Sequence, residues 1–303
     1  MWTAARDEGE VTDGRVGRMN TPRIVVAGPA AWNTMVLLDR LPEPRPHAVF
    51  ARGSVRTLGG TSAGKVLHLA DLGVVATLVA DVGTDPEGDL ILAALRHALG
   101  AEVLARRVAG PSEQHLNLMT DAGERLSIYL ALPGTSPEPD PAAVSRVATA
   151  EHVVLDLGAV GRNLLPAAVA SGATLWTDLH DYDGVAEFHQ PFADACSYVF
   201  LNDDGTDDHR ELMTSLLERG ASTVVCTLGA RGAVARTAEG WFECPAERAE
   251  VLDTNGAGDA FFAGFFGAHL SGAGTAECLR AGARQATRAL GSRHLSPLLD
   301  EDG

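Results

Sequence analysis

A run of small residues that ends in an aspartate lies at positions 253–261 and reads DTNGAGDAF. Gly256, Ala257 and Gly258 carry almost no side chain, so a ligand can approach their backbone N–H groups closely. The apolar residues that follow predict a buried helix, whose N-terminus attracts an anion. Asp259 would repel a bound phosphate if it were only a ligand, and it fits better as a base that takes a proton from an attacking hydroxyl. This spacing therefore indicates phosphoryl transfer.

Every fixed position of the run matches D-T-x-G-A-G-D-x-F, so the run resembles the signature of the ribokinase-like, or PfkB, family of carbohydrate and nucleoside kinases. The resemblance implies that Asp259 is the catalytic base and that the amides of Gly256, Ala257 and Gly258 form the anion hole. A structural alternative is that the glycines only let a helix pack closely and that Asp259 only caps it. A nine-residue match late in the chain favours the functional interpretation.

Apolar, strand-like runs alternate with helical patterns along most of the chain. They lie at residues 23–28, 75–80, 152–157, 174–178, 198–201 and 222–227. Such alternation is typical of βαβ units. It predicts an α/β fold with a central, mainly parallel sheet flanked by helices, and with ligands at the carboxyl ends of the strands.

Two segments interrupt the alternation. The first is 48–57, and the second is the pair 114–120 and 124–132, which predicts a hairpin. The resemblance implies that strands from about 47–57 and 112–132 form a small β-sheet lid. Such a lid would close over the acceptor and exclude water, which otherwise competes for the phosphate. The resemblance also allows a homodimer through the lid.

The composition is typical of an enzyme with one large core. The 303 residues are 46% hydrophobic, and the formal net charge of -16 argues against nucleic acid or an anionic membrane as a partner. No apolar run approaches the ~20 residues that cross a bilayer, and the start lacks a secretory signal, so we expect a cytoplasmic protein. We predict a disordered leader at 1–20, a single kinase domain at 21–298 and a tail at 299–303.

A second stretch, 59–65 (GGTSAGK), partly resembles the family's Gly-Gly turn that leads into a helix. Paired glycines let the backbone approach a polyhydroxylated acceptor closely. Alone, such a turn is more often an ordinary loop. Its occurrence together with the Asp259 run favours a role in acceptor binding. The resemblance assigns acceptor binding to Asn33, Gly59, Gly60, Gly64, Lys65 and Asp259.

Three positions of this acceptor site depart from the ribose kinases of the family. Asn33 stands where they carry an aspartate, Gly64 where they carry an asparagine, and Gly158 where they carry a glutamate. Carboxylates hold sugar hydroxyls firmly, so ribose is a poor candidate. The space at Gly64 and Gly158 predicts a larger acceptor, a sugar or sugar-derived acid first and a nucleoside second.

Lys65 is the only lysine in the chain. It could contact an acidic or phosphorylated acceptor as a point charge. The alternative is a surface lysine on its helix, which we favour because the sequence names no partner for it.

A further element of the family indicates which residues bind the nucleotide. Residues 227–232 (TLGARG) resemble its T-x-G-x-x-G turn, which lies against ATP and contains Thr227, Gly229 and Gly232. Asn202 begins the equivalent of N-x-x-E, an element that organises Mg²⁺ and the phosphates. Together with Thr254 of the signature, these residues are the predicted ATP contacts. A strand followed by a tight turn is the plain alternative for 227–232.

The glutamate of N-x-x-E is replaced by Gly205. Mg²⁺ takes oxygen ligands, so Asp203 or Asp204 could substitute, or both could be solvated turn residues. The resemblance also suggests a monovalent cation such as K⁺ beside Asp253. Asp178, His180 and Asp181 lie close enough in sequence to suggest a metal site, which we interpret instead as a structural turn.

These observations predict an ATP-dependent phosphotransferase that moves the γ-phosphate to a hydroxyl of a sugar or sugar-derived molecule. A nucleoside kinase is one alternative. A non-catalytic sugar or nucleotide sensor on the same fold is another, motivated by the missing side chains at Gly64, Gly158 and Gly205. The intact Asp259 favours an enzyme.

Overall fold

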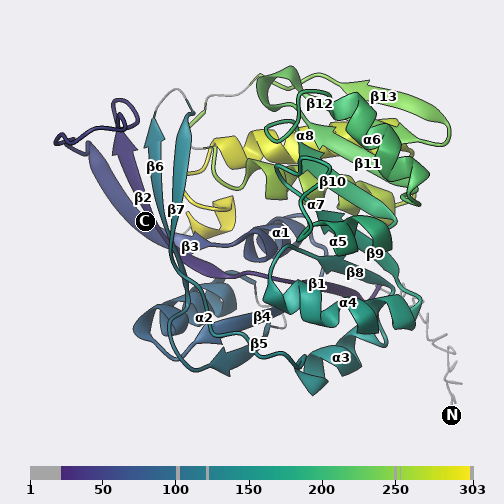
Figure 1. Ribbon diagram of the computed structural model, residues 1–303, viewed down its shortest axis with the longest axis horizontal. Helices are drawn as coiled ribbons and strands as arrows, with labels where there is room; N and C mark the ends of the chain where they lie inside the picture. The colour runs from purple at the N-terminus through teal and green to yellow at the C-terminus, as the bar shows by residue number, and fades with distance from the viewer. Residues whose placement is uncertain (1–21, 100–102, 121–122, 249–250, 253, 301–303) are drawn as a thin grey trace, which may run out of the picture.

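A large, twisted sheet forms the centre of the molecule (Figure 1). The computed structural model describes residues 22–99, 103–120, 123–248, 251–252 and 254–300. Within these ranges the large sheet has nine strands in the order β13-β12-β11-β10-β9-β8-β1-β4-β5. The strands are β1 (Ile24–Ala27), β4 (Thr77–Gly83), β5 (Val103–Val108), β8 (His152–Leu155), β9 (Thr174–Asp178), β10 (Tyr198–Asn202), β11 (Thr223–Thr227), β12 (Ala233–Thr237) and β13 (Gly240–Cys244).

The pairing confirms the predicted α/β fold with a mainly parallel sheet. All neighbours from β5 to β11 pair in parallel, and β12 runs antiparallel to both β11 and β13. Each of the six predicted strand runs overlaps an observed strand of this sheet, and four of them contain it whole. Sequence reasoning missed β5, β12 and β13, which lie at the two edges of the sheet.

Helices cover both faces of the large sheet and define two apolar cores. One core is built with α1 (Thr61–Asp71), α2 (Pro86–Leu99), α7 (Ala257–Leu270) and α8 (Thr275–Leu290). The other is built with α3 (Pro141–Val147), α4 (Ala159–Ser171), α5 (Gln190–Ala195) and α6 (His209–Glu218). Side chains alternate along β1, so Ile24 and Val26 join the first core while Val25 and Ala27 join the second.

Helix α7 lies between the sheet and α8 because it is apolar all round. All of its residues from Ala260 to Phe266 are buried. Gly264 lets α8 approach closely, since a Cβ there would lie 2.5 Å from the carbonyl oxygen of Ala281. No helix in the described part of the chain combines the length and apolarity needed to cross a membrane.

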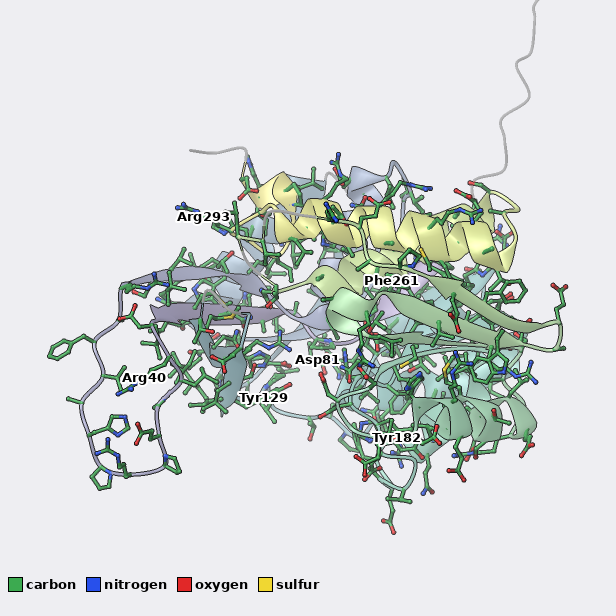
Figure 2. The ribbon with its side chains drawn as sticks, turned by 90° about the horizontal axis from the view of Figure 1, so that it is seen from above. Arg40, Asp81, Tyr129, Tyr182, Phe261 and Arg293 are labelled. Atoms are coloured by element: carbon green, nitrogen blue, oxygen red, sulfur yellow. The ribbon has the colours of Figure 1, made fainter. Side chains whose placement is uncertain are left out.

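A small sheet stands beside the large one (Figure 1). Its four described strands, in the order β3-β2-β6-β7, are β2 (Ala31–Leu38), β3 (Gly53–Gly59), β6 (Glu113–Thr120) and β7 (Arg125–Ala131). The β6–β7 hairpin follows the predicted one to within a residue at each end. Sequence reasoning missed β2, which begins four residues after β1 ends, and the predicted strand at 48–57 begins only at Gly53. The loop between β2 and β3, which carries Arg40, projects away from the rest of the molecule (Figure 2).

Candidate active site

The N-terminus of α7 holds the glycine-rich run. Gly256 is the N-cap and has left-handed backbone angles, φ 78° and ψ -2°. A Cβ at Gly256 would also lie 2.7 Å from the carbonyl oxygen of Leu295, so this position requires glycine. Gly258 is exposed, and no atom lies within 4 Å of the place where its Cβ would be. Backbone N–H groups at this helix end can therefore be reached by an anion.

Asp259 lies in the first turn of α7 and points toward α1. Its Oδ1 accepts a hydrogen bond from the hydroxyl of Thr61 and lies 3.0 Å from Nζ of Lys65. A Cβ at Gly64 would lie 2.6 Å from Oδ2 of Asp259. The space at Gly64 is therefore filled by the carboxylate of Asp259. This differs from the prediction that it admits a larger acceptor.

Lys65 lies at the centre of a buried ionic cluster. Its Nζ is 3.0 Å from Oδ1 of Asp156, 3.0 Å from Oδ1 of Asp259 and 3.3 Å from Oδ2 of Asp178. It also donates to Thr61 Oγ1 at 2.5 Å. The side chain of Lys65 is 0% exposed, so the prediction of a surface lysine was wrong. Four oxygens already surround its three N–H groups, so a direct contact to an acceptor is not available in this arrangement either.

Burial and charge act in opposite directions on the pKa values in this cluster. Burial works to lower the pKa of Lys65, but attraction to Asp156, Asp259 and Asp178 outweighs it and raises the pKa above that of an ordinary lysine. Burial works to raise the pKa of Asp178, but His180, Lys65 and the hydrogen bond from the His180 N–H lower it to about 2. The pKa of Asp156 is raised because its loss of hydration dominates.

Asp156 and Asp178 were not predicted as site residues, although the sequence contains a signal for them. Both carboxylates stand at the carboxyl ends of adjacent parallel strands, β8 and β9, and such ends meet at one edge of a sheet. Lys65 is surrounded by apolar residues on α1, where a lysine needs buried partners. Among the described residues no group of three or more His, Cys, Asp or Glu side chains could hold a metal ion.

Three of the predicted acceptor residues, Asn33, Gly59 and Gly60, lie where β2 pairs with β3 and α1 begins. Asn33 of β2 is 3% exposed and lies opposite Thr57 and His115 in the small sheet. A Cβ at Gly59 would lie 2.2 Å from Nδ2 of Asn33, so Gly59 makes room for that side chain. Gly60 has φ +93°, and a Cβ there would lie 2.5 Å from the carbonyl oxygen of Pro29. Within the described structure, Oδ1 of Asn33 is buried without a hydrogen-bond partner.

A hollow next to these residues opens at the carboxyl ends of β1, β4 and β8. Gly28, Asp81, Glu113 and Gly158 are among the residues that line it. Arg106 donates to both carboxylate oxygens of Asp81, at 2.8 and 2.6 Å, and Glu113 lies 2.9 Å from Nε2 of His115. Asp81 belongs to β4 of the large sheet and Tyr129 to β7 of the small one, and Figure 2 labels both in the region between the two sheets.

Two of the predicted nucleotide residues lie side by side on neighbouring strands. Asn202 ends β10, Thr227 ends β11, and the two are partners in the strand register. The turn after β11 forms a short 3₁₀ helix, η1 (Gly229–Arg231), with left-handed Gly229 at φ +56°. A Cβ at Gly232 would lie 2.1 Å from the carbonyl oxygen of Cys244, so this glycine serves the packing of the turn as well.

Gly205, the departure from N-x-x-E, also has a structural reason. A Cβ there would lie 1.9 Å from the carbonyl oxygen of Asp181, so no side chain fits at this position. Asp203 forms an ion pair with Arg231, and Oδ1 of Asn202 accepts a hydrogen bond of 2.9 Å from the N–H of Asp204. The carboxylate of Asp204 is left facing solvent.

Of the two remaining predicted residues, Thr254 lies near the tip of the β6–β7 hairpin and Asp253 lies outside the described structure. A Cβ at Gly123, next to this tip, would lie 3.4 Å from Cγ2 of Thr254, so the small sheet reaches the glycine-rich run. Asp253, the predicted neighbour of a monovalent cation, lies outside the described residues, as does the predicted leader at 1–20.

Comparisons with known proteins agree with this geometry. The model of the pfkB family of carbohydrate kinases matches residues 193–300. The acarbose 7(IV)-phosphotransferase of an Actinoplanes species is 32% identical over 268 residues, 86% of this chain and 89% of that protein. The ATP-dependent ribose-1-phosphate kinase of Halopiger xanaduensis is 29% identical, over 82% of this chain and 85% of that protein.

Solved structures show the same fold along nearly the whole chain. A microbiome-derived acarbose kinase superposes with a TM-score of 0.80 at 30% identity, covering 90% of this chain and 93% of that one. The ribokinase of Arabidopsis thaliana, complexed with ribose and ATP, superposes with a TM-score of 0.76 at 22% identity, covering 91% and 95%. Because the Actinoplanes phosphotransferase is 32% identical over 86% of this chain, the chain belongs to the pfkB family of carbohydrate kinases. It is an ATP-dependent phosphotransferase for sugar-like acceptors.

Proposed function

We propose that Asp259 is the base of this kinase and that the amides at residues 256–258 bind the transferred phosphoryl group. The observation that carries the proposal is the position of Asp259. It lies in the first turn of α7, directly after left-handed Gly256 and open Gly258. Among the described residues, all hydrogen bonds and ion pairs to its carboxylate go to Oδ1, which leaves Oδ2 for a reactant.

In the proposed reaction, Oδ2 of Asp259 takes the proton of an acceptor hydroxyl. The hydroxyl oxygen forms a bond to the γ-phosphorus, the bond from that phosphorus to the bridging oxygen breaks, and ADP leaves with the electron pair. The amides at the N-terminus of α7 stabilise the negative charge on the equatorial oxygens. The small sheet excludes water from the acceptor, a role supported by the approach of Gly123 to Thr254.

Mg²⁺ fits the residues of the nucleotide side as a partly protein-bound ion. Mg²⁺ keeps several waters and takes one or two carboxylates together with substrate phosphates, so a cage of protein ligands is not required. Asp204 is exposed and near Asn202, whereas Asp203 is engaged by Arg231. We therefore propose Asn202, Asp204 and Thr227 as the residues on the Mg²⁺ and phosphate side. When bound, Mg²⁺ neutralises charge on the phosphates.

The proposed acceptor is an uncharged or weakly charged sugar, and acarbose is the first compound to test. Two relatives that are at least 30% identical along most of this chain are an acarbose 7(IV)-phosphotransferase and an acarbose kinase. The described lining of the acceptor hollow includes Asp81 and Glu113 and contains no lysine or arginine. Such a lining offers an acceptor phosphate no cation of its own, and Arg106 behind it is already paired with Asp81. The buried Oδ1 of Asn33 can accept a hydrogen bond from a sugar hydroxyl.

The test is ADP release from Mg-ATP with acarbose, ribose, fructose, ribose 1-phosphate, fructose 6-phosphate and inosine. We expect turnover with neutral sugars and little with the phosphorylated ones. Asp259→Asn should fold and bind ATP but lower kcat by roughly 10²–10⁴-fold. Turnover retained in Asp259→Asn removes the base from the proposal, and preferred use of ribose 1-phosphate overturns the acceptor class.

The family resemblance also supports a monovalent cation beside Asp253. The measurement is kinase activity in potassium chloride against tetramethylammonium chloride at equal ionic strength. A proposed activation by K⁺ predicts a higher kcat in the first salt, and equal rates contradict it. Asp253→Ala should remove the difference.

We further propose a homodimer through the small sheet. Leu126, Ile128 and Leu130 alternate along β7, so they lie on one face, and they are 44%, 40% and 56% exposed. An apolar strip of this kind on a sheet is typical of an interface. Ile128→Lys should convert a dimer to a monomer in analytical ultracentrifugation. Ser127→Lys, on the opposite face of the same strand, is the matched control, and a monomeric wild type overturns the proposal.

A further inference from the structure

Lys65 has no part in the reaction as described so far, although it contacts the proposed base. We infer that Lys65 is a positioning residue: together with Thr61, its ammonium holds Oδ1 of Asp259 so that Oδ2 is presented to the acceptor. This inference rests on the proposed role of Asp259 as the base. Lys65 acts through Asp259 and does not touch the substrate itself.

The geometry around Oδ1 of Asp259 forms a closed triangle. Thr61 donates its hydroxyl proton to Oδ1, Lys65 Nζ lies 3.0 Å from Oδ1, and Nζ also donates to Thr61 Oγ1 at 2.5 Å. Thr61 and Lys65 are one turn apart on α1, so a single helix supplies both donors. On the other side of the carboxylate, Gly64 leaves just enough room for Oδ2. The carboxylate is thus fixed in rotation as well as in place.

The ammonium is in turn fixed by the large sheet. Nζ lies 3.0 Å from Oδ1 of Asp156, next to β8, and 3.3 Å from Oδ2 of Asp178, the last residue of β9. Ser62 donates to the other oxygen of Asp156 at 2.6 Å, and the N–H of His180 donates to Oδ1 of Asp178 at 3.0 Å. Neither carboxylate can rotate away without losing a second bond. The position of the base on α7 is therefore set by two strand ends.

The ring of Phe262 closes the remaining side of the ammonium. Nζ lies 5.1 Å from its centroid, a cation–π distance, and Phe262 follows Asp259 by three residues on α7. The ammonium therefore contacts α7 at two places one turn apart. A small rotation of α7 would break both contacts, so Lys65 also holds the helix that carries the anion-binding amides.

The charge of Lys65 suits the chemistry next to it. A carboxylate beside a triphosphate is surrounded by negative charge. The ammonium 3.0 Å away offsets part of that negative charge without entering the acceptor space. Buried ionic clusters contribute little net stability compared with apolar residues of similar volume. Stability alone is therefore a weak reason for this cluster, and a reactive carboxylate at its rim is a better one.

The kinetic test compares Lys65→Met and Lys65→Arg with wild type. Lys65→Met should lower kcat by about 10²-fold, the scale for a displaced reacting group, with KM for ATP unchanged within a factor of three or so. Lys65→Arg keeps the charge and should recover part of the lost kcat. A kcat within twofold of wild type in Lys65→Met, or a KM for ATP that rises as much as kcat falls, overturns the inference.

A second measurement works even if the Lys65 variants do not fold. Since Lys65 is the only lysine, protein grown with [15Nζ]lysine gives a single side-chain ammonium signal by NMR. We expect this signal to persist at neutral pH through slow proton exchange, to move in Asp259→Asn, and to move when acarbose is added. Arg231→Met, which removes an exposed ion pair, is the control and should leave it unchanged. An unmoved signal in Asp259→Asn, or an ammonium that exchanges like that of free lysine, overturns the inference.

The two sets of variants separate this inference from the proposed function. If Asp259→Asn keeps its turnover, the proposed base is wrong and the positioning role falls with it. If Asp259→Asn loses turnover while Lys65→Met keeps it, the base stands and only the role of Lys65 is wrong.

Discussion

Two buried polar clusters lie one turn apart on helix α1, and their basic side chains differ in charge. Lys65 is charged and His68 is neutral. The Lys65 cluster consists of Lys65, Asp156, Asp178 and Asp259 around a charged ammonium. The His68 cluster lies toward α8 and the C-terminal segment and consists of His68, Asp71, Gln285, Arg288 and the carbonyl group of Leu295. Lys65 and His68 are both 0% exposed, so burial alone does not decide the charge of a basic side chain.

The partners of His68 favour its neutral form. Its Nε2 lies 3.0 Å from the carbonyl oxygen of Leu295, and the amide of Gln285 donates to Nδ1 at 3.3 Å. A second proton on Nδ1 would face that amide donor. Asp71 is already engaged by Gln285 and Arg288. Burial therefore dominates and lowers the pKa of His68 to about 4. The contrast shows that carboxylates in direct contact keep Lys65 charged despite its burial.

The largest expected difference between the clusters is in the free energy of unfolding. Lys65→Met leaves buried carboxylates without their cation and should cost about 3–5 kcal/mol. His68→Gln removes at most a pair of neutral hydrogen bonds and should cost about 1–2 kcal/mol. Urea denaturation of both variants at pH 7.5 measures the two losses. Equal losses would mean that the Lys65 cluster is not ionic in the folded chain.

The pH dependence of stability should separate the clusters next. The pKa of His68 falls from 6.5 to about 4 on folding, so stability is intact above pH 6.5 and is lost as the pH falls from 6.5 toward 4. The shift corresponds to a loss of up to about 3 kcal/mol. Asp178, with a lowered pKa of about 2, contributes stability that is lost only below 3.8. Lys65, with a raised pKa, contributes stability that is lost only above 10.5.

Denaturation at pH 7.5 and pH 4.5 measures this loss, to which the partly buried His152, His189 and His269 also contribute because burial lowers their pKa values. The comparison with His68→Gln isolates the share of His68, because glutamine does not titrate and the variant should lose less stability between these pH values. An unchanged slope in this variant would contradict the neutral histidine.

A substitution next to the Lys65 cluster that keeps every charge should lower kcat more than it lowers the free energy of unfolding. Gly64→Ala places a methyl group 2.6 Å from Oδ2 of Asp259 and forces that carboxylate to move. We expect kcat to fall by roughly 10–10²-fold, the cost of a displaced reacting group. Gly267→Ala on α7 is the matched control, since its Cβ would make ordinary contacts, at 3.6 Å to Leu72 and 3.9 Å to Val74. Equal kcat in both variants would mean that Asp259 adapts without loss.

The smallest effect is expected at an exposed ion pair outside both clusters. Arg231 and Asp203 pair at the surface with side-chain exposures of 64% and 20%. A double-mutant cycle with Arg231→Met and Asp203→Asn should give a coupling of under about 1 kcal/mol, and 1 M salt should remove most of it. A coupling that resists salt would show that this pair is as well shielded as the Lys65 cluster.

The sequence predicts the reacting groups of this site better than the residues that hold them in place. Asp259 and its glycines were predicted from their residue types, because a phosphate-binding helix end needs a local pattern of small residues. The α/β fold was predicted from the alternation of elements, which is likewise local. Lys65 was misjudged because its partners come from β8, β9 and α7, which no local pattern joins. Gly64 was misjudged for the same reason, since the atom that fills its space belongs to Asp259, 195 positions further along the chain.

The small sheet illustrates a second limit. Strand β2 follows β1 after three residues and belongs to another sheet, so the boundary between the sheets leaves little trace in the sequence. From Ala31 to Val36 its burial pattern alternates between buried and partly buried residues, but the residues of the strand, AWNTMVLL, are nearly all apolar or small. Which face of such a strand is covered depends on the elements around it.

The burial of the only lysine also affects how readily sugars can react with this kinase. Reducing sugars carry an aldehyde that condenses with primary amines, and lysine side chains are the usual target in proteins. Here the one side-chain amine of the chain is 0% exposed and held protonated by its carboxylates, while arginine supplies every other fixed positive charge. The folded enzyme should therefore resist glycation of its side-chain amine even in concentrated sugar.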